Sequence, residues 1–543
     1  MKQLGLIFAF IVISMTHSAQ GQIQNFSEQD SLRGSITPER AWWDLKAYRL
    51  HLKPDAAKKE VKGMNRVVFE SLTPGQTMQI DLQEPMQITK ITHDSKELNY
   101  SRNGNVFLIE FAQAFEKGSR DSIDIYFEGR PKISSRPPWD GGLTWTVDSH
   151  GKDFFATSVQ GEGASIFWPC KDHMYDEVDN MDIYLETDLD LVGVSNGRLV
   201  NQETKENSII WHWQVLNPIN NYGVNMNVGN YVNFYETYKG LKGDLFCNYY
   251  VLEENEERAV KQFTQVSKMM EAFEYWFGPY PFYEDSFKLV EVPYLGMEHQ
   301  SSVTYGNGYQ NGYLGSDLSG TGWGLKFDFI IIHEAGHEWF ANNITNIDIA
   351  DMWIHESFTA YSESLFVEYY YGKQAGQEYV IGTRRNIQND RPIIGNYDVN
   401  HSGSGDMYYK GSNMLNTLRT WIDNDELWRD ILVGLNSDFY HQTVNTGQIE
   451  KYIADKSGLD LKVFFDQYLR TIEIPTLELK VKHNKIHYRY CTSLKGFNLP
   501  IQLELNESLQ TIHPTQKWQV LEMESDIVEY QVNPNYYINL VVK

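Results

Sequence analysis

Two histidines four residues apart, His333 and His337, constrain the fold more than any other feature of the sequence. They follow an apolar stretch, residues 327–332, within a pattern that predicts a helix over residues 325–342. Residues i and i+4 share one helix face, so both imidazoles can reach a single metal ion. Glu334 is rotated by about 100° on the same helix and would lie beside that ion, where it can take a proton from a metal-bound water. An isolated string of this kind also arises by chance on a solvated helix face, so a further ligand is needed.

Glu356, nineteen residues after His337, is the candidate third ligand. It opens a second helical run after a turn at residues 349–351, and two antiparallel helices joined in this way could bring it to the metal. A catalytic zinc has three protein ligands and one open position, and two histidines with one carboxylate favour zinc. We therefore expect one zinc ion per chain, held by His333, His337 and Glu356.

The hydrophobic periodicity divides the rest of the chain into three parts. Apolar and polar residues alternate in short strands over residues 47–233, for example at residues 211–215. The period becomes helical from residue 253 to residue 277, and helical patterns continue, after a strand at residues 287–292, to about residue 469. Alternation returns from residue 474. We predict an α+β multidomain protein with an N-terminal antiparallel β domain (22–238), a mainly helical catalytic domain (239–472) and a small C-terminal β-sandwich (473–543).

Charge and cysteine content exclude several classes of protein. The 543 residues include 47 Lys and Arg against 72 Asp and Glu, a net charge of −25 that would repel nucleic acid. Only Cys170, Cys247 and Cys491 are present, too few and too scattered for a disulfide framework or a cysteine zinc site. A glycine-rich loop at residues 306–324 matches no phosphate-binding or dinucleotide motif, so we interpret it as a plain loop.

The first residues have the pattern of a secretory signal peptide. Lys2 precedes an apolar stretch at residues 4–15, and small residues lead to a cleavage site after Gly21. No later apolar run is long enough to span a bilayer. We expect residues 1–21 to be removed and the protein to be exported, to the periplasm or beyond, without a membrane span.

Four short motifs follow one another in an order that resembles the gluzincin zinc aminopeptidases, the family of aminopeptidase N and leukotriene hydrolase. The resemblance extends over nearly the whole mature chain, which would be a short, three-domain member of the family. The motifs are Gln160-Gly161-Glu162 before Pro169-Cys170-Lys171-Asp172, then Gly296-Met297-Glu298-His299, then the zinc helix (residues 333–340) with Glu356 (in residues 353–358), and last Tyr408-Tyr409-Lys410-Gly411.

The resemblance implies a thermolysin-like catalytic domain and peptide substrates with a free N-terminus. It implies that Glu334 acts as general base and then acid, and that the Tyr408 hydroxyl stabilises the oxyanion. It further implies that Glu298 holds the substrate α-ammonium, with Glu162 as a second candidate, and that Gln160 lines the first side-chain pocket. Gly296, Met297 and His299 would complete the substrate-binding segment.

Two positions depart from the family pattern, and two other functions remain open. His299 and His355 stand where the family has asparagine, and His299 would change contacts to the substrate backbone. The long C-terminal helical domain of the larger members is replaced by a short β domain.

A thermolysin-like endopeptidase would share the zinc helix but needs no amine anchor at Glu298. A non-catalytic peptide-binding scaffold would be expected to lack ligands or base, and all are present. Epoxide hydrolysis rests on family analogy alone.

Overall fold

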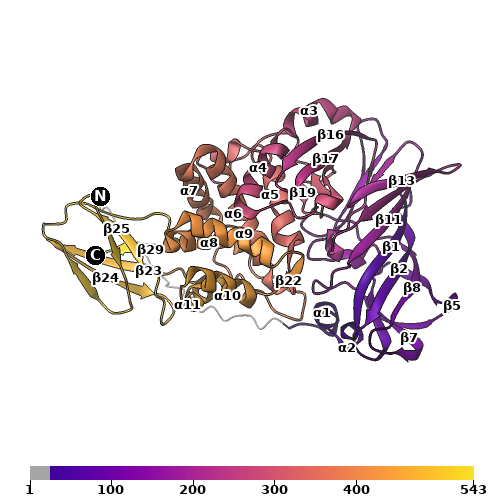
Figure 1. The fold of residues 1–543 in the computed structure, drawn as a ribbon, viewed down its shortest axis with the longest axis horizontal. Coiled ribbons are helices and arrows are strands. Elements are labelled where there is room, and N and C mark those ends of the chain that lie inside the picture. The colour runs from indigo at the N-terminus through magenta and orange to yellow at the C-terminus, as the bar shows by residue number, and fades with distance from the viewer. Residues whose placement is uncertain (1–24) are drawn as a thin grey trace, which may run out of the picture.

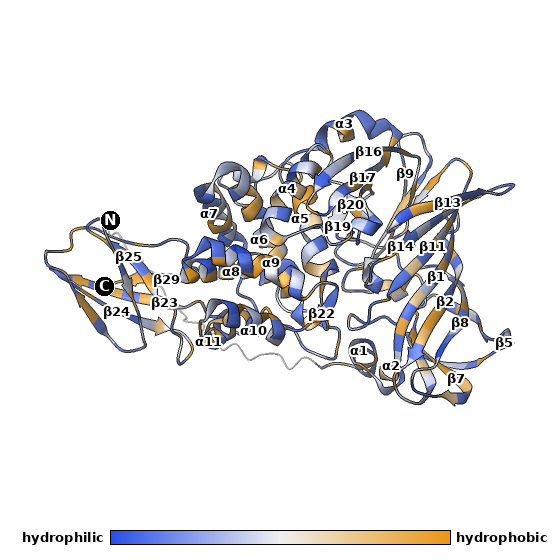
Figure 2. Ribbon diagram, in the orientation of Figure 1, coloured by the Kyte–Doolittle hydropathy of each residue, from blue (hydrophilic) through white to orange (hydrophobic). Residues whose placement is uncertain are grey.

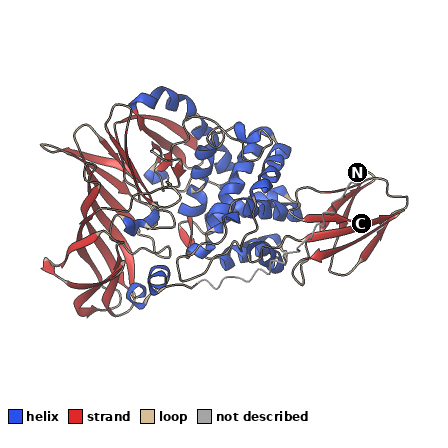
Figure 3. Cartoon of the chain, turned by 180° about the vertical axis from the view of Figure 1, so that it is seen from behind, coloured by secondary structure: helices blue, strands red, loops and turns tan. Residues whose placement is uncertain are grey.

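The computed structural model describes residues 25–543, which form three parts in a row (Figure 1). Sheets make up one end, helices the middle and a second set of strands the other end, as the view from behind also shows (Figure 3). The expected α+β multidomain layout is confirmed. The predicted signal peptide, residues 1–21, lies outside the described residues. Within residues 25–543, no helix is both long and apolar enough to cross a membrane.

The N-terminal part is built on an eight-stranded sheet in which only the pair β1–β11 is parallel. Its strands alternate between buried and more exposed residues, which is visible as alternating hydropathy in Figure 2. In spatial order they are β13 (Arg198–Thr204), β14 (Ile209–Val215), β11 (Asn180–Thr187), β1 (Trp43–Asp55), β2 (Glu60–Ser71), β8 (Arg120–Gly129), β4 (Gln87–His93) and β5 (Lys96–Glu97).

Two smaller sheets and two short helices complete this part. The helices are α1 (Glu28–Gly34) and α2 (Pro38–Ala41). One sheet contains β12 (Val192–Val194), β15 (Asn227–Gly229), β10 (Asp153–Ser158) and β9 (Gly142–Val147); the other contains β3 (Gly75–Asp81), β7 (Val106–Phe115) and β6 (Asn99–Asn103).

The boundary predicted at residue 238 falls inside β16 (Tyr231–Gly240). This strand is hydrogen-bonded along its whole length to β17 (Gly243–Leu252) in a five-stranded sheet. A division at residue 238 would therefore cut through this pair of strands. The remaining strands of that sheet are β18 (Phe287–Glu291), β20 (Val303–Tyr305) and β19 (Gly296–Met297).

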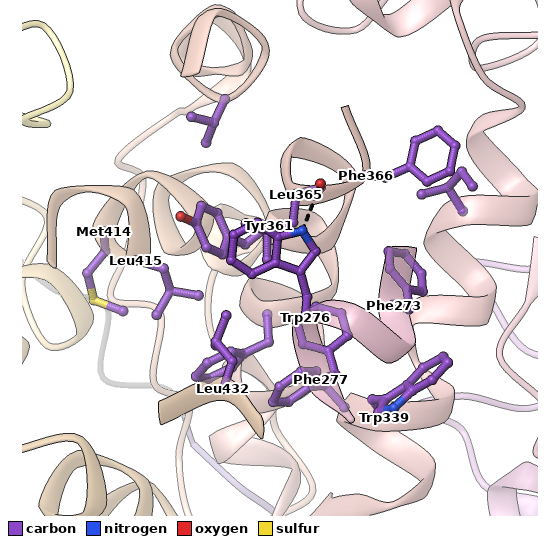
Figure 4. Packing of buried hydrophobic residues seen from close by; sticks show 14 of the residues in the cluster. Phe273, Trp276, Phe277, Trp339, Tyr361, Leu365, Phe366, Met414, Leu415 and Leu432 are labelled. Carbon is purple, nitrogen blue, oxygen red and sulfur yellow. Dashed lines mark hydrogen bonds between the residues drawn. The ribbon is translucent and has the colours of Figure 1, made fainter. Parts of the chain in front are cut away.

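The helical part packs around one large aromatic core (Figure 4). The indole N–H of Trp276 donates to the Leu365 carbonyl oxygen at 3.1 Å inside this core. The helix predicted at residues 253–277 is split into two, α3 and α4. The helices are α3 (Glu256–Gln262), α4 (Gln265–Phe277), α5 (Phe329–Gly336), α6 (Trp353–Tyr371), α7 (Lys373–Gly382), α8 (Tyr409–Ile422), α9 (Asp425–Asp438), α10 (Thr446–Ser457) and α11 (Lys462–Leu469), with a parallel pair β21 (Ile344–Asn346) and β22 (Gln442–Val444).

The C-terminal part consists of two small sheets, as expected, although β23 and β29 pair in parallel. Its buried residues belong to the same hydrophobic cluster as the helical part, so the two share a continuous core. The strands are β27 (Gln519–Glu522), β24 (Lys485–Thr492), β23 (Thr476–Lys482) and β29 (Asn539–Val542) in one sheet, and β26 (Ser508–Ile512), β25 (Ile501–Leu505) and β28 (Tyr530–Val532) in the other.

Candidate active site

Helix α5 carries the first half of the predicted metal site. Asp328 directly precedes this helix, and its carboxylate accepts hydrogen bonds from the backbone N–H groups of Ile330 and Ile331 and so caps the helix. The apolar residues that follow are buried, which fixes the face that His333 and Glu334 present. The helix is shorter than the predicted stretch of residues 325–342. After His337 the chain makes a π-helical turn over residues 338–342 and leaves the helix axis.

The three predicted metal ligands converge. Glu356 lies in the first turn of α6, and one of its carboxylate oxygens, Oε2, is 3.8 Å from His333 Nε2 and 3.4 Å from His337 Nε2. One ligand atom from each residue lies within 4.8 Å of the others, and all three side chains are buried. Glu356 Oε2 has no hydrogen-bond partner. A buried carboxylate oxygen facing two imidazole nitrogens is costly when unpaired. The set therefore fits a tetrahedral divalent cation such as zinc.

Neighbouring polar groups orient both imidazoles for a metal. His333 Nδ1 donates to Glu363 Oε1 at 2.7 Å, and Glu363 in turn accepts from the Tyr379 hydroxyl at 2.6 Å. His337 Nδ1 donates to the Phe340 carbonyl oxygen at 3.1 Å. Since a carboxylate and a carbonyl oxygen can only accept, Nδ1 is the donor in both rings, which leaves each Nε2 facing Glu356 as the atom that would bind a metal. Sequence reasoning missed Glu363, although it lies seven residues after Glu356, on the same helix face.

The metal face opens into a cleft of about 1040 Å³ between the N-terminal and helical parts. Gln160, from the N-terminal part, reaches the site. Its amide Nε2 donates to the carboxylates of Glu298 and Glu356, in the second case at 3.0 Å. The position of Gln160 means that both domains build the cleft.

Glu298 lies next to the predicted base. Its side chain is 2% exposed, and a carboxylate oxygen lies within 4.8 Å of ligand atoms of Glu334 and His337. Burial raises the pKa of Glu298 to about 7, although His337 opposes this shift. Burial also raises the pKa of Glu334. An ammonium group placed beside Glu298 would stabilise its charged form and, away from water, would interact with it strongly.

Tyr408 lines the cleft directly before α8, and its ring lies 5.9 Å from that of His333, nearly parallel to it. Burial raises the pKa of its phenol well above the usual value, so the hydroxyl keeps its proton. The glycine of the motif, Gly411, fixes the position of Tyr408 by allowing close packing of two helices. A Cβ on Gly411 would lie 1.9 Å from Ser357 Oγ, so α8 can approach α6 this closely only at a glycine. Tyr409 also lines the cleft.

The other predicted residues divide between the cleft and its surroundings. Gly296 and Met297 line the cleft. His299 is fully buried and is not among the residues that line the cleft. Glu162 is also outside the lining, since its side chain is partly exposed and pairs with Lys132 at 3.3 Å. His355 is buried, and its Nε2 accepts from the Asn346 backbone N–H at 2.9 Å, away from the cleft.

Comparisons with known proteins agree with this geometry. A family model described as the peptidase family M1 domain matches residues 261–468, and one described as the peptidase M1 N-terminal domain matches residues 45–222. A leucyl aminopeptidase from Saccharolobus solfataricus is 20% identical over 88% of this chain and 60% of that protein. Leukotriene A-4 hydrolase from Xenopus laevis is 21% identical over 82% of this chain and 74% of that protein.

The fold is similar to that of solved structures as well. An M1 zinc metallopeptidase from Deinococcus radiodurans superposes with a TM-score of 0.67 at 17% identity, covering 81% of this chain and 98% of that one. The chain spans about three fifths of the length of several curated relatives that it matches.

Proposed function

The chain belongs to peptidase family M1, and from this membership we propose that it is a zinc aminopeptidase that removes N-terminal residues from peptides. The observation that carries the proposal is the buried carboxylate of Glu298 beside Glu334 and the metal ligands. An exopeptidase must hold a free α-ammonium next to the scissile bond, and a buried carboxylate is the group that does so. An endopeptidase has no need of it.

The metal would be held by His333, His337 and Glu356, one ion per chain, and when bound it supplies Lewis acidity and an activated water. Glu334 is placed to accept a proton at its carboxylate and to return it to the leaving amine. Glu298, together with the amide of Gln160, orients the substrate N-terminus. The Tyr408 hydroxyl, which remains protonated, is the donor available to a developing oxyanion.

The test compares a free peptide with its Nα-acetylated form, both offered to the zinc-loaded protein. We expect cleavage of the free peptide and a loss of at least about a hundredfold on acetylation, because the charge that pairs with Glu298 is gone. The Glu298→Gln variant should lower kcat/KM for free peptides while zinc stays bound. Equal cleavage of the two peptides would favour the endopeptidase.

We also propose that the protein is exported, on the basis of the leader pattern in residues 1–21. The N-terminal sequence of the mature protein, isolated from the extracytoplasmic fraction, should begin at Gln22. An intact Met1 on protein from the cytoplasm would reject this proposal.

A further inference from the structure

The charged residues that line the cleft fall into two groups. Glu298, Glu334 and Glu356 gather with the two histidines at the metal face. The cationic lining residues are Arg385 and Arg391, which lie on the segment between α7 and α8. Both are exposed, and neither forms an ion pair with any carboxylate of residues 25–543. Arg391 interacts electrostatically with the neighbouring Asp390 without forming a salt bridge, so both guanidinium groups remain able to pair with an anionic group of a ligand.

One of these arginines, Arg385, packs against the glycine-rich loop of residues 306–324. A Cβ on Gly320 would lie 1.9 Å from Arg385 Nη1, so the guanidinium rests on the backbone where a side chain would otherwise stand. Gly320 has a φ of +68°, which glycine adopts without strain. The loop therefore has a structural use that its sequence did not reveal, because the absence of a side chain at Gly320 makes room for Arg385.

The second arginine is also anchored at the cleft wall. Arg391 Nη2 donates to the carbonyl oxygen of Gly403 at 3.0 Å, and Gly403 itself lines the cleft. A guanidinium has five N–H donors, so this bond leaves most of them available. The planar fork of arginine matches a carboxylate better than any other side chain does.

We propose that Arg385 and Arg391 bind a carboxylate on the leaving-group side of the substrate, so that the enzyme prefers di- and tripeptides with a free C-terminus. The inference rests on the proposed aminopeptidase function. Glu298 would hold the positive end of such a zwitterion and the arginines its negative end. A peptide of two or three residues spans at most about 7–11 Å when extended. In a longer peptide only an acidic side chain could offer the same group.

The experiment compares four substrates that share one N-terminal residue, chosen as the one cleaved fastest in an aminoacyl p-nitroanilide series. They are the p-nitroanilide itself, the tripeptide X-Gly-Gly, its C-terminal amide, and the amide X-Gly-Glu-NH₂. For the zinc-loaded protein we expect kcat/KM for the acid to exceed that for the Gly-Gly amide about tenfold, chiefly through KM. Raising NaCl from 0.05 to 0.5 M should reduce this ratio because the groups are exposed. X-Gly-Glu-NH₂ shows whether an acidic side chain can replace the C-terminal carboxylate.

The readout is the ratio of acid to amide, which is internal to each variant and independent of its overall activity. The double variant Arg385→Gln/Arg391→Gln should bring the ratio close to one. Arg120→Gln, which removes an exposed arginine on β8, should keep the wild-type ratio. A wild-type ratio near one, or a ratio that persists in the double variant, would overturn the inference. So would equal rates for X-Gly-Glu-NH₂ and X-Gly-Gly, which would show recognition of acidic residues in general. If no substrate is cleaved at all, the aminopeptidase proposal itself fails.

Discussion

At the scale of single residues, Glu334 separates proton transfer from metal binding. Its carboxylate lies beside the ligands without being one of the set that meets at Glu356. We predict that Glu334→Gln keeps one zinc per chain and loses about 10²–10⁴ in kcat, because only the proton acceptor is removed. Metal analysis and steady-state kinetics on the same preparation check this. Loss of zinc in parallel with activity would show that Glu334 supports the metal instead.

Tyr408 and Tyr409 form a natural pair for a second test, since both line the cleft and only one follows the motif register. We predict that Tyr408→Phe lowers kcat at least about tenfold and changes KM little, because an oxyanion donor acts mainly in the transition state. Tyr409→Phe should have a much smaller effect on kcat. The reverse order would move the donor to Tyr409, and no effect from either would leave the oxyanion to the metal alone.

Residue spacing predicted the metal ligands because a helix brings i and i+4 to one face whatever surrounds it. The same rule would have found Glu363, which supports His333. The family motifs that suggested Glu162 and His299 could not show where these side chains lie, because the direction of a loop side chain depends on its neighbours. Lys132 draws Glu162 out of the cleft, and the strands around His299 bury it.

At the scale of elements, the packing of α8 against α6 sets the position of Tyr408 relative to Glu356. We predict that Gly411→Ala destabilises the protein by about 1–3 kcal/mol and lowers kcat, because the added methyl group would collide with Ser357 and separate the helices. Gly447→Ala is the matched control. Gly447 also lies in a helix, α10, and a Cβ there would meet only Asn445 Oδ1, at 3.4 Å. This control should be neutral or stabilising by up to about 1 kcal/mol. Urea denaturation and kcat measurements on both variants decide the matter.

The early end of α5 could not be read from the sequence. Residues 338–342 continue a pattern that is compatible with a helix, and tertiary contacts alone unwind it. The Glu338 carboxylate accepts from the Ser301 backbone N–H and the Tyr280 hydroxyl. The unwound turn also places the Phe340 carbonyl oxygen on His337 Nδ1. Local propensity cannot anticipate bonds to partners tens of residues away.

At the scale of the whole molecule, His173 joins the N-terminal helix α1 to the β domain and makes this junction sensitive to acid. Its Nε2 donates to the Gly34 carbonyl oxygen at 3.0 Å, while Nδ1 accepts from the Tyr175 backbone N–H at 3.2 Å, an arrangement that needs the neutral ring. Burial, and after it the charge of Arg40, lower the pKa of His173 to about 4.

The unfolded chain takes up this proton near pH 6.5 and the folded chain does not. The contribution of His173 to the free energy of unfolding is therefore fully present above that pH. It falls as the pH drops toward 4, by up to about 3 kcal/mol from this group. We predict that His173→Gln, which can still donate and accept, gives a shallower fall in the urea midpoint between pH 6.5 and 4.5. Parallel curves for wild type and variant would contradict this. Measurements at pH 7.5 serve as the reference, because the His173 ring of the wild type is neutral there in both the folded and the unfolded chain.

The three-part layout was predictable because hydrophobic periodicity changes where the architecture changes. The exact division was not, because residues 231–240 alternate like any strand. Only their pairing with β17 assigns them to the five-stranded sheet. Periodicity shows that a strand exists, whereas its sheet is decided by partners elsewhere in the chain.

The bonds that Gln160 makes across the two domains restrict which residues can stand at this position. A single amide from the N-terminal domain bonds to Glu298 and Glu356 of the catalytic domain. A substitution at position 160 would therefore remove a bond to the amine anchor and to a metal ligand at once, so this position should vary little among lineages that keep the activity. For the same reason, a recombination event that exchanged one domain and kept the other would yield a folded hybrid whose amine pocket is mismatched.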